Sequence, residues 1–139
     1  MANPVCDVLL TERSLEARAL STASEMGGIV DFWGVVRATE EGAQISGIDY
    51  EAHAAMAEHQ LRAIAEECAK RFELMQIIVE HRVGFVPVGE ASLFVRVGSR
   101  HRAEAFRASQ WIVDELKKRV PIWKHPRAEA ASEALRATS

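Results

Sequence analysis

Cysteine is scarce in this sequence, which has two among its 139 residues, with four prolines and one tyrosine. Cys6 and Cys68 are 62 positions apart, so they lack the close spacing of zinc ligands. Neither lies in a pattern typical of a cysteine nucleophile. Cys68 falls within a helical pattern, where a small buried apolar side chain is the ordinary interpretation, rather than a disulfide or a redox role.

Long apolar runs are also absent. No stretch approaches the roughly 20 residues that a membrane-spanning helix needs. Residues 1–7 lack the basic and apolar regions of a signal peptide. His53, His59 and His81 are scattered without metal-ligand spacing, and each is expected to be a surface or satisfied core side chain. We therefore expect a cytoplasmic protein with no membrane partner and no metal site.

The composition fits one ordinary domain, with 48% hydrophobic and 27% charged residues. The net charge of −3 is unevenly divided: residues 1–92 carry 7 Lys/Arg and 15 Asp/Glu, and residues 93–127 carry 9 and 3. The balances are −8 and +6, and the last 12 residues add −1. A basic third on an acidic protein indicates a local anion site more than a broad nucleic-acid surface, with a solvated basic face as the alternative.

Hydrophobic periodicity predicts a single α+β domain over 1–126. We expect strands over 5–10, 29–36, 45–52, 74–83 and 91–98, and helices over 14–24, 54–72 and 99–118. Polar residues predict a mobile loop over 38–44, and glycine and proline predict turns over 84–89. The tail over 127–139 has weak helical character, and disorder is the alternative.

Core-facing positions follow the same periods. Alternation predicts that Leu93, Val95 and Val97 face the core of a sheet. Helical spacing predicts one buried stripe at Met56, Leu61, Ile64, Cys68 and Phe72, and a second at Ala105, Ala108, Ile112 and Leu116.

Residues 116–124, Leu-Lys-Lys-Arg-Val-Pro-Ile-Trp-Lys, are the most informative stretch. Three cations close a helix, where the macrodipole favours them, and Pro121 stops it. Lys117 and Lys124 are therefore expected in a fixed relation, with little acid nearby, as suits an anionic ligand. The neighbouring cations favour a neutral Lys117 that could act as acid, base or nucleophile, and the helix end favours the ammonium. The sequence leaves both open.

Two further cationic groups point to the same chemistry. Ser-Arg-His-Arg at 99–102 is predicted at a helix start, where free N–H groups bind anions and Arg102 can bind a phosphate or carboxylate in bidentate fashion. Arg37 ends a strand three residues after Gly34, an arrangement suited to a ligand clamp. Exposed first-turn residues and an ordinary surface arginine are the alternatives.

The helix length bears on how these groups combine. Arg102 and Lys117 are 15 residues apart, or roughly 22 Å along a helix. One small ligand does not span that distance. If both ends serve one site, the second must come from another subunit of a two-fold dimer.

Six motifs share an order and spacing with a known family. They are Phe-Trp-Gly-Val-Val-Arg at 32–37, Tyr-Glu-Ala-His at 50–53 with Met-Ala-Glu at 56–58, His-Arg-Val-Gly at 81–84, Val-Gly-Glu at 88–90, Ser-Arg-His-Arg at 99–102, and the 116–124 stretch. Together they resemble the MoaE family, the large catalytic subunit of molybdopterin synthase, over about residues 5–125.

The resemblance implies an α/β-hammerhead fold and a homodimer capped at each end by a small ubiquitin-like sulfur carrier, in a heterotetramer. The carrier's C-terminal Gly-Gly thiocarboxylate would deliver two sulfurs in turn to cyclic pyranopterin monophosphate, which gives the molybdopterin dithiolene. It implies no cofactor, because the carrier brings the sulfur. No cysteine nucleophile is then needed.

The resemblance also assigns roles. Lys117 and Lys124 are the expected catalytic residues, and the expected substrate-binding residues are Val36, Arg37, His101, Arg102, Lys117 and Lys124. Lys117 would handle proton transfer or a transient acyl attachment beside the thiocarboxylate carbonyl. Lys124 would stabilise developing negative charge. Arg37, with His101 and Arg102 of the second subunit, would hold the pterin phosphate.

The chain departs from the family pattern after Lys124. The family continues with one residue and then a glutamate, whereas this chain has His125-Pro126, and a later segment containing Gly and Trp is missing. A non-catalytic relative that binds the carrier as a module or scaffold is therefore the alternative function. A nucleic-acid binder is a third, disfavoured by the small size of the basic patch.

Overall fold

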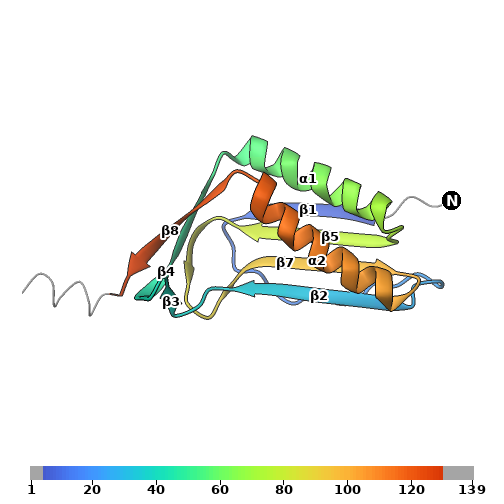
Figure 1. The fold of residues 1–139 in the computed structure, drawn as a ribbon, viewed down its shortest axis with the longest axis horizontal. Helices are drawn as coiled ribbons and strands as arrows, with labels where there is room; N and C mark the ends of the chain where they lie inside the picture. Colours follow the sequence, from blue (N-terminus) through green and yellow to red (C-terminus); the bar gives the residue numbers. More distant parts are fainter. Residues whose placement is uncertain (1–4, 130–139) are drawn as a thin grey trace, which may run out of the picture.

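The structure, a computed structural model, describes residues 5–129, which form two α-helices and eight β-strands (Figure 1). Their bounds in chain order are β1 Val5–Thr11, β2 Gly28–Val35, β3 Thr39–Glu40, β4 Ala43–Ala52, α1 Ala54–Arg71, β5 Gln76–Arg82, β6 Gly84–Pro87, β7 Ala91–Ser99, α2 Arg102–Arg119 and β8 Ile122–Ala128. The α+β class predicted from the sequence is confirmed. Neither helix is long and apolar enough to cross a membrane.

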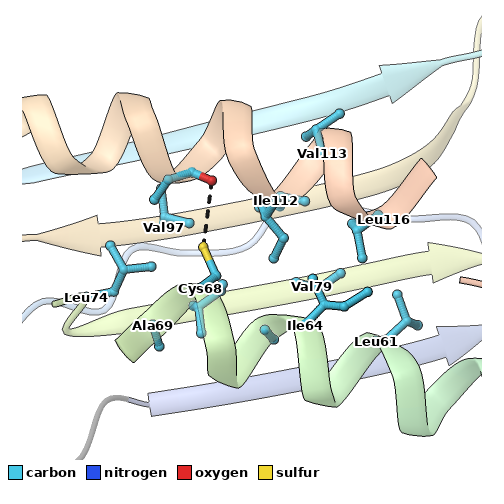
Figure 2. Packing of buried hydrophobic residues seen from close by; sticks show 14 of the residues in the cluster. Leu61, Ile64, Cys68, Ala69, Leu74, Val79, Val97, Ile112, Val113 and Leu116 are labelled. Carbon is cyan, nitrogen blue, oxygen red and sulfur yellow. Dashed lines mark hydrogen bonds between the residues drawn. The ribbon is translucent and has the colours of Figure 1, made fainter. Parts of the chain in front are cut away.

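The main sheet has the strand order β1-β5-β7-β2, in which β1 and β5 are parallel and the other pairs are antiparallel. Both helices cover one face of it, α1 over β1 and β5, and α2 over β7 and β2 (Figure 1). The core between helices and sheet contains both predicted stripes in large part, together with Leu93, Val95 and Val97 (Figure 2). Met56 is the exception, because its side chain is 54% exposed.

A small second sheet lies at one end of the main sheet (Figure 1). Its central strand is β4, which lies between the short β3 and β6 in the strand order and also pairs with β8. A separate apolar cluster holds it together: Val36, Ile45, Ile48, Tyr50 and Val86 are buried, with Val88 and Ile122 packed against them. The chain thus builds two cores, and Lys124 lies on β8 of the smaller sheet.

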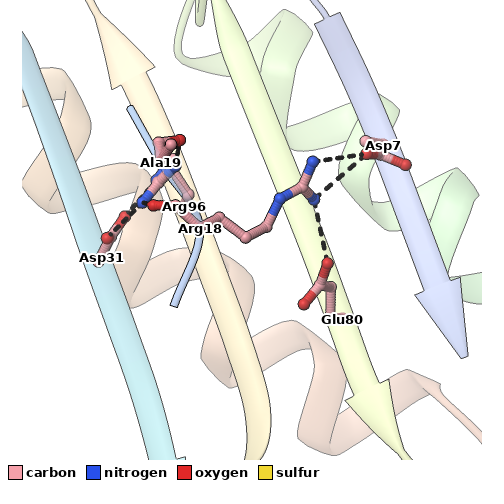
Figure 3. Close-up of polar contacts among 6 residues, drawn as sticks. All are labelled: Asp7, Arg18, Ala19, Asp31, Glu80 and Arg96. Atoms are coloured by element: carbon pink, nitrogen blue, oxygen red, sulfur yellow. Dashed lines mark hydrogen bonds and ion pairs between the residues drawn. The ribbon is translucent and has the colours of Figure 1, made fainter. Parts of the chain in front are cut away.

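The helix predicted over 14–24 is wrong. Residues 12–27, here called the strap, run without helix or strand across the face of the main sheet opposite the helices. Arg96 of β7 donates hydrogen bonds to the backbone carbonyls of Arg18 and Ala19, each at 2.9 Å, and Arg18 in turn pairs with Asp7 and Glu80 (Figure 3). Carbonyls engaged by a buried guanidinium are not available to a helical ladder, which explains the failure of the helical pattern.

Two predicted loops also contain strand. Residues 38–44 are not a mobile loop but a hairpin of β3 and β4, whose turn has positive φ at Glu41 (50°) and Gly42 (81°). Glycine tolerates that conformation without strain. In the stretch predicted as turns, β6 pairs with β4, so that 84–87 adds a strand to the small sheet.

The two ends of α2 also differ from the sequence expectation. The helix begins at Arg102 rather than Ser99, because Ser99 still belongs to β7 and its hydroxyl donates to the carbonyl of His101. After Pro121 the chain forms β8, which the sequence pattern did not predict and which includes Arg127 of the expected tail. Residues 130–139 of that predicted tail lie outside the described residues.

Candidate functional site

Lys117 and Lys124 lie on either side of the turn that the proline was expected to impose. Lys117 is in the last turn of α2, and Lys124 is the third residue of β8; both side chains are exposed. The helix ends at Arg119 and is capped by Val120, whose backbone N–H donates to the Leu116 carbonyl and whose own carbonyl accepts from Ile122. The apolar residues around Pro121 thus fix the path between the two lysines.

Lys124 stands beside an aromatic pair that links the two sheets. It is the register partner of Tyr50 on β4, so the two side chains project from the same face of the small sheet. The ring of Tyr50 packs edge-on against the imidazole of His81, at the end of β5, with centroids 5.4 Å apart. Through this contact, His81 packs the end of the main sheet against the β4–β8 pair, which contains Lys124.

Val36 and Arg37 lie against the same small core. Val36 is buried there with Tyr50, its N–H donates to the Glu90 carbonyl at 3.0 Å, and its carbonyl accepts from Gly89 at 2.9 Å. These bonds anchor the backbone directly before Arg37, whose side chain is exposed. Arg37 directly follows one residue of this apolar cluster, and Lys124 is the register partner of another, Tyr50. Val36 itself is 3% exposed.

His101 and Arg102 lie at the opposite end of the molecule. Ser99, at the end of β7, pairs with Gly28 at the start of β2, whereas Arg37 follows the far end of that strand. Arg102 and Lys117 are 15 residues apart on α2, or about 22 Å along the helix. One chain therefore does not bring His101 and Arg102 to the lysines, as the helix-length argument anticipated.

The predicted site cations differ from their sequence neighbours in pairing. Arg100, Arg119 and Arg127 each form an ion pair with a carboxylate, and His125 forms a hydrogen bond with the carboxylate of Glu51. Among residues 5–129, no ion pair involves Arg37, Arg102, Lys117 or Lys124. Lys118 likewise forms no ion pair with a described residue, so the absence of an ion pair does not by itself define the site. Exposed cations held on a fixed backbone without acidic partners can bind an anionic ligand.

The unusual sequence after Lys124 keeps β8 attached to β4. His125 pairs with Glu51 at 3.0 Å, and Arg127 pairs with Asp49 and lies over the Phe85 ring at 4.5 Å. Pro126 is tolerated because β8 is an edge strand, where a missing N–H can face solvent. The His-Pro departure therefore leaves the strand bearing Lys124 intact.

A groove of about 740 Å³ beside the strap is a poorer candidate for the site. Its lining includes Glu12, Arg13, Glu16, Arg18 and Glu80, so charges of both signs neutralise one another. None of the six predicted site residues lines it. The described part of the chain also contains no group of three or more His, Cys, Asp or Glu side chains placed to hold a metal ion.

Sequence reasoning missed Tyr50 and His81 as neighbours of Lys124. His81 was judged by itself as a surface or core histidine. Both residues lie in motifs quoted for the family resemblance, and this was the available signal. The contact itself is invisible in sequence, because Tyr50 and His81 are on different strands and Lys124 lies on a third.

The fold and site define a class: a two-sheet α+β domain whose exposed cations around one sheet junction form no ion pair with the described residues. A family model described as "MoaE protein" matches residues 10–119, and the chain belongs to this family. It is 45% identical over 109 residues to the molybdopterin synthase catalytic subunit of Pyrococcus abyssi, covering 78% of this chain and 74% of that one. The Thermoplasma volcanium catalytic subunit is 40% identical over 100 residues, covering 72% and 73%.

Solved structures agree. Molybdopterin synthase from Staphylococcus aureus superimposes with a TM-score of 0.80 and 27% identity, covering 87% of this chain and 90% of that one. A complex of subunits 1 and 2 of molybdopterin-converting factor from Helicobacter pylori gives 0.69 at 20% identity, covering 90% and 89%. The family fold expected from the sequence motifs is confirmed. The chain spans about half the length of some longer relatives, including 56% of the human catalytic subunit, to which it is 40% identical.

Proposed function

We propose that this chain is the large subunit of a molybdopterin synthase and acts as a sulfurtransferase. It takes sulfur from the thiocarboxylated C-terminus of a small ubiquitin-like carrier and places it on cyclic pyranopterin monophosphate. Family membership supports the reaction class. The observation that carries the proposal is the set of exposed cations without acidic partners, Arg37, Lys117 and Lys124, on backbone fixed around the sheet junction. Both reactants are anions, so such cations suit both.

The roles follow from position and chemistry. Lys117, on the helix end, meets the carbonyl of the carrier thiocarboxylate and transfers a proton or holds a transient acyl group. Lys124 stabilises negative charge that develops on the substrate or intermediate. Arg37 binds the pterin phosphate, for which a guanidinium offers paired donors. The carrier supplies the sulfur, so the reaction needs no cofactor bound to this chain.

The same proposal includes a homodimer with one carrier at each end. Arg102 lies about 22 Å along α2 from Lys117 of its own chain, so His101 and Arg102 reach such a site only in a partner subunit. The Helicobacter pylori structure is titled a complex of two subunits, which is consistent with a carrier partner here. A cytoplasmic location fits these partners.

Replacement of Lys117 by Ala tests the catalytic role. We expect Lys117→Ala to abolish formation of the dithiolene, measured as a fluorescent molybdopterin derivative, and to leave the Kd for the carrier within about twofold. Lys118→Ala is the matched control, because Lys118 is an exposed, unpaired lysine one position away. Near-normal turnover by Lys117→Ala would refute the assignment. An inactive wild-type protein that still binds carrier would instead support the non-catalytic module.

A further inference from the structure

His81 has a fixed tautomer. Its Nδ1 lies 2.8 Å from the backbone carbonyl oxygen of Arg82. A carbonyl oxygen only accepts hydrogen bonds, so Nδ1 carries the proton and donates. The second ring nitrogen, Nε2, is then left with a lone pair and acts as an acceptor in the neutral ring.

Lys124 is the charged side chain that lowers the pKa of His81, by less than burial does and against the hydrogen bond to the Arg82 carbonyl, which raises it. Its register partners on the two neighbouring strands are Leu10 of β1 and Leu93 of β7, both apolar. The small sheet contributes the Tyr50 ring and, next to Tyr50, Lys124. Burial lowers the pKa of His81 below its ordinary value of 6.5, and the positive charge of Lys124 lowers it further. His81 is therefore neutral at pH 7 and lies within electrostatic range of the Lys124 ammonium.

The aromatic contact fixes the ring in place. Tyr50 is 6% exposed and belongs to the small core, so its ring has little freedom to move. Edge-to-face packing of aromatic rings stabilises one relative orientation. The imidazole is thus held from two sides, by the Arg82 carbonyl and by Tyr50.

We propose that His81 is a positioning residue for Lys124: the neutral imidazole offers Nε2 as an acceptor to the Lys124 ammonium and keeps it directed into the anion site. The inference deepens the proposed function, because it depends on Lys124 for its effect on activity. A neutral neighbour orients the ammonium and leaves its charge for the substrate. A carboxylate in the same place would cancel that charge, and a protonated imidazole would repel it.

The proximity of His81 and Lys124 can be tested without any assay of activity. NMR titration of the histidine rings follows the pKa of His81 in the wild-type protein and in Lys124→Met. We expect the pKa of His81 to rise by roughly half a unit in Lys124→Met, because a nearby positive charge is gone. Lys118→Met is the control and should leave the titration of His81 unchanged, and His59, within α1, serves as an internal reference. An unchanged His81 titration in Lys124→Met would overturn the inference, whatever the protein catalyses.

The positioning role predicts a distinct pH profile. His81→Gln keeps a neutral hydrogen-bonding group at every pH, and His81→Met fills similar space without an acceptor. We expect His81→Met to lower kcat about tenfold with little change in KM, the size of effect that one lost hydrogen bond produces. His81→Gln should retain most of the activity and should lack the fall in activity that we expect of the wild type at pH values below 6.5, where His81 becomes protonated.

A purely structural His81 gives a different pattern. Both variants would then lower Tm and keep the wild-type kcat and pH profile when assayed on folded protein, and this result would overturn the proposal. If the wild type forms no molybdopterin but His81 responds to Lys124→Met, the proposed function fails and the His81–Lys124 relation stands.

Discussion

Arg96 on β7 and Asp31 on β2 form a two-pronged ion pair across the main sheet. Nε and Nη2 of Arg96 lie 2.7 and 2.9 Å from the two carboxylate oxygens of Asp31, its register partner. The Arg96 side chain is 3% exposed, and its other bonds go to the strap carbonyls of Arg18 and Ala19 (Figure 3). One buried guanidinium thus attaches the strap to the sheet. Asp31 raises the pKa of Arg96 above its ordinary value, chiefly by hydrogen bonding.

Loss of the Asp31 carboxylate should destabilise the fold. We expect Asp31→Ala to reduce the free energy of unfolding by about 2–4 kcal/mol, because Arg96 then stays buried without a counter-charge. The range extends down to about 2 kcal/mol because the Asp31 side chain is 31% exposed, so that solvent already screens its charge. Urea unfolding measures the change. Glu25→Gln is the control: it removes the exposed ion pair to Arg100 and should cost less than about 1 kcal/mol. Equal effects of the two substitutions would contradict this account.

The two free cysteines should differ in reactivity and in pH dependence. Cys68 is 0% exposed and burial raises its pKa to about 12, while Cys6 is only half-buried with a pKa raised to a lesser extent. At pH 8 we expect a thiol reagent to modify Cys6 first and Cys68 only on unfolding, as shown by mass spectrometry of labelled peptides. Fast labelling of Cys68 in the folded protein would be incompatible with its place in the core.

The sign of the pH effect follows from the same shift. The native state holds the Cys68 proton up to about pH 12, and the unfolded state releases it from about 9.0. The stability that the protonated Cys68 thiol contributes to the native state is fully present below pH 9 and is lost as the pH rises above 9. Between pH 8 and 10 the loss is about 1.4 kcal/mol. The stability deficit of Cys68→Ala relative to wild type should therefore shrink over that interval.

Gly27 should not tolerate a side chain although it is exposed. A Cβ at this position would lie 2.2 Å from the backbone carbonyl oxygen of Arg100, just before the start of α2. We expect Gly27→Ala to cost about 1–3 kcal/mol in stability, as overpacking does elsewhere. It should also raise the KM for the pterin several-fold by displacing His101 and Arg102. Ser24→Ala, in the same strap, serves as the control. A Gly27→Ala protein with the stability and KM of the wild type would contradict the close approach of Gly27 to the Arg100 carbonyl.

Mixed dimers should reveal whether two chains share each site. Lys117→Ala and Arg102→Ala are each expected to be nearly inactive alone. Mixed in equal amounts and allowed to exchange, they should recover about a quarter of wild-type activity, because half of the dimers are mixed and each has one intact site of two. Activity of the mixture that never exceeds that of the separate variants would refute a shared site and leave the other roles of Lys117 untouched.

Strong periodic segments were predictable because local chemistry and tertiary burial agree there. The helix predicted over 54–72 is α1, Ala54–Arg71, and the alternating Leu93, Val95 and Val97 face the core. The helix predicted within the strap was wrong because local pattern and tertiary contacts disagree there. Its helical pattern competes with the Arg96 donors from a strand about 77 residues away, and those long-range bonds determine its backbone.

The candidate site likewise contains features that the sequence predicted and features that it did not. The lysines and the proline stop were visible because they lie within nine residues, and the family motifs assigned Arg37, His101 and Arg102. The position of Lys124 opposite Tyr50, whose ring packs on His81, was not visible in the sequence. It depends on the pairing of β8 with β4, and β8 contains a proline and charged residues that carry no strand pattern.

The sequence by itself determined the α+β class, the two helices, the cationic residues and the separation of roughly 22 Å between the cationic ends of α2. These properties depend on local periodicity, residue chemistry and the fixed rise of a helix. Only the tertiary structure decided the irregular path of the strap, the strand formed by 122–128 and the placing of Tyr50 and His81 beside Lys124. Each of these depends on hydrogen bonds or packing between residues far apart in the chain, whose pairing no local pattern specifies.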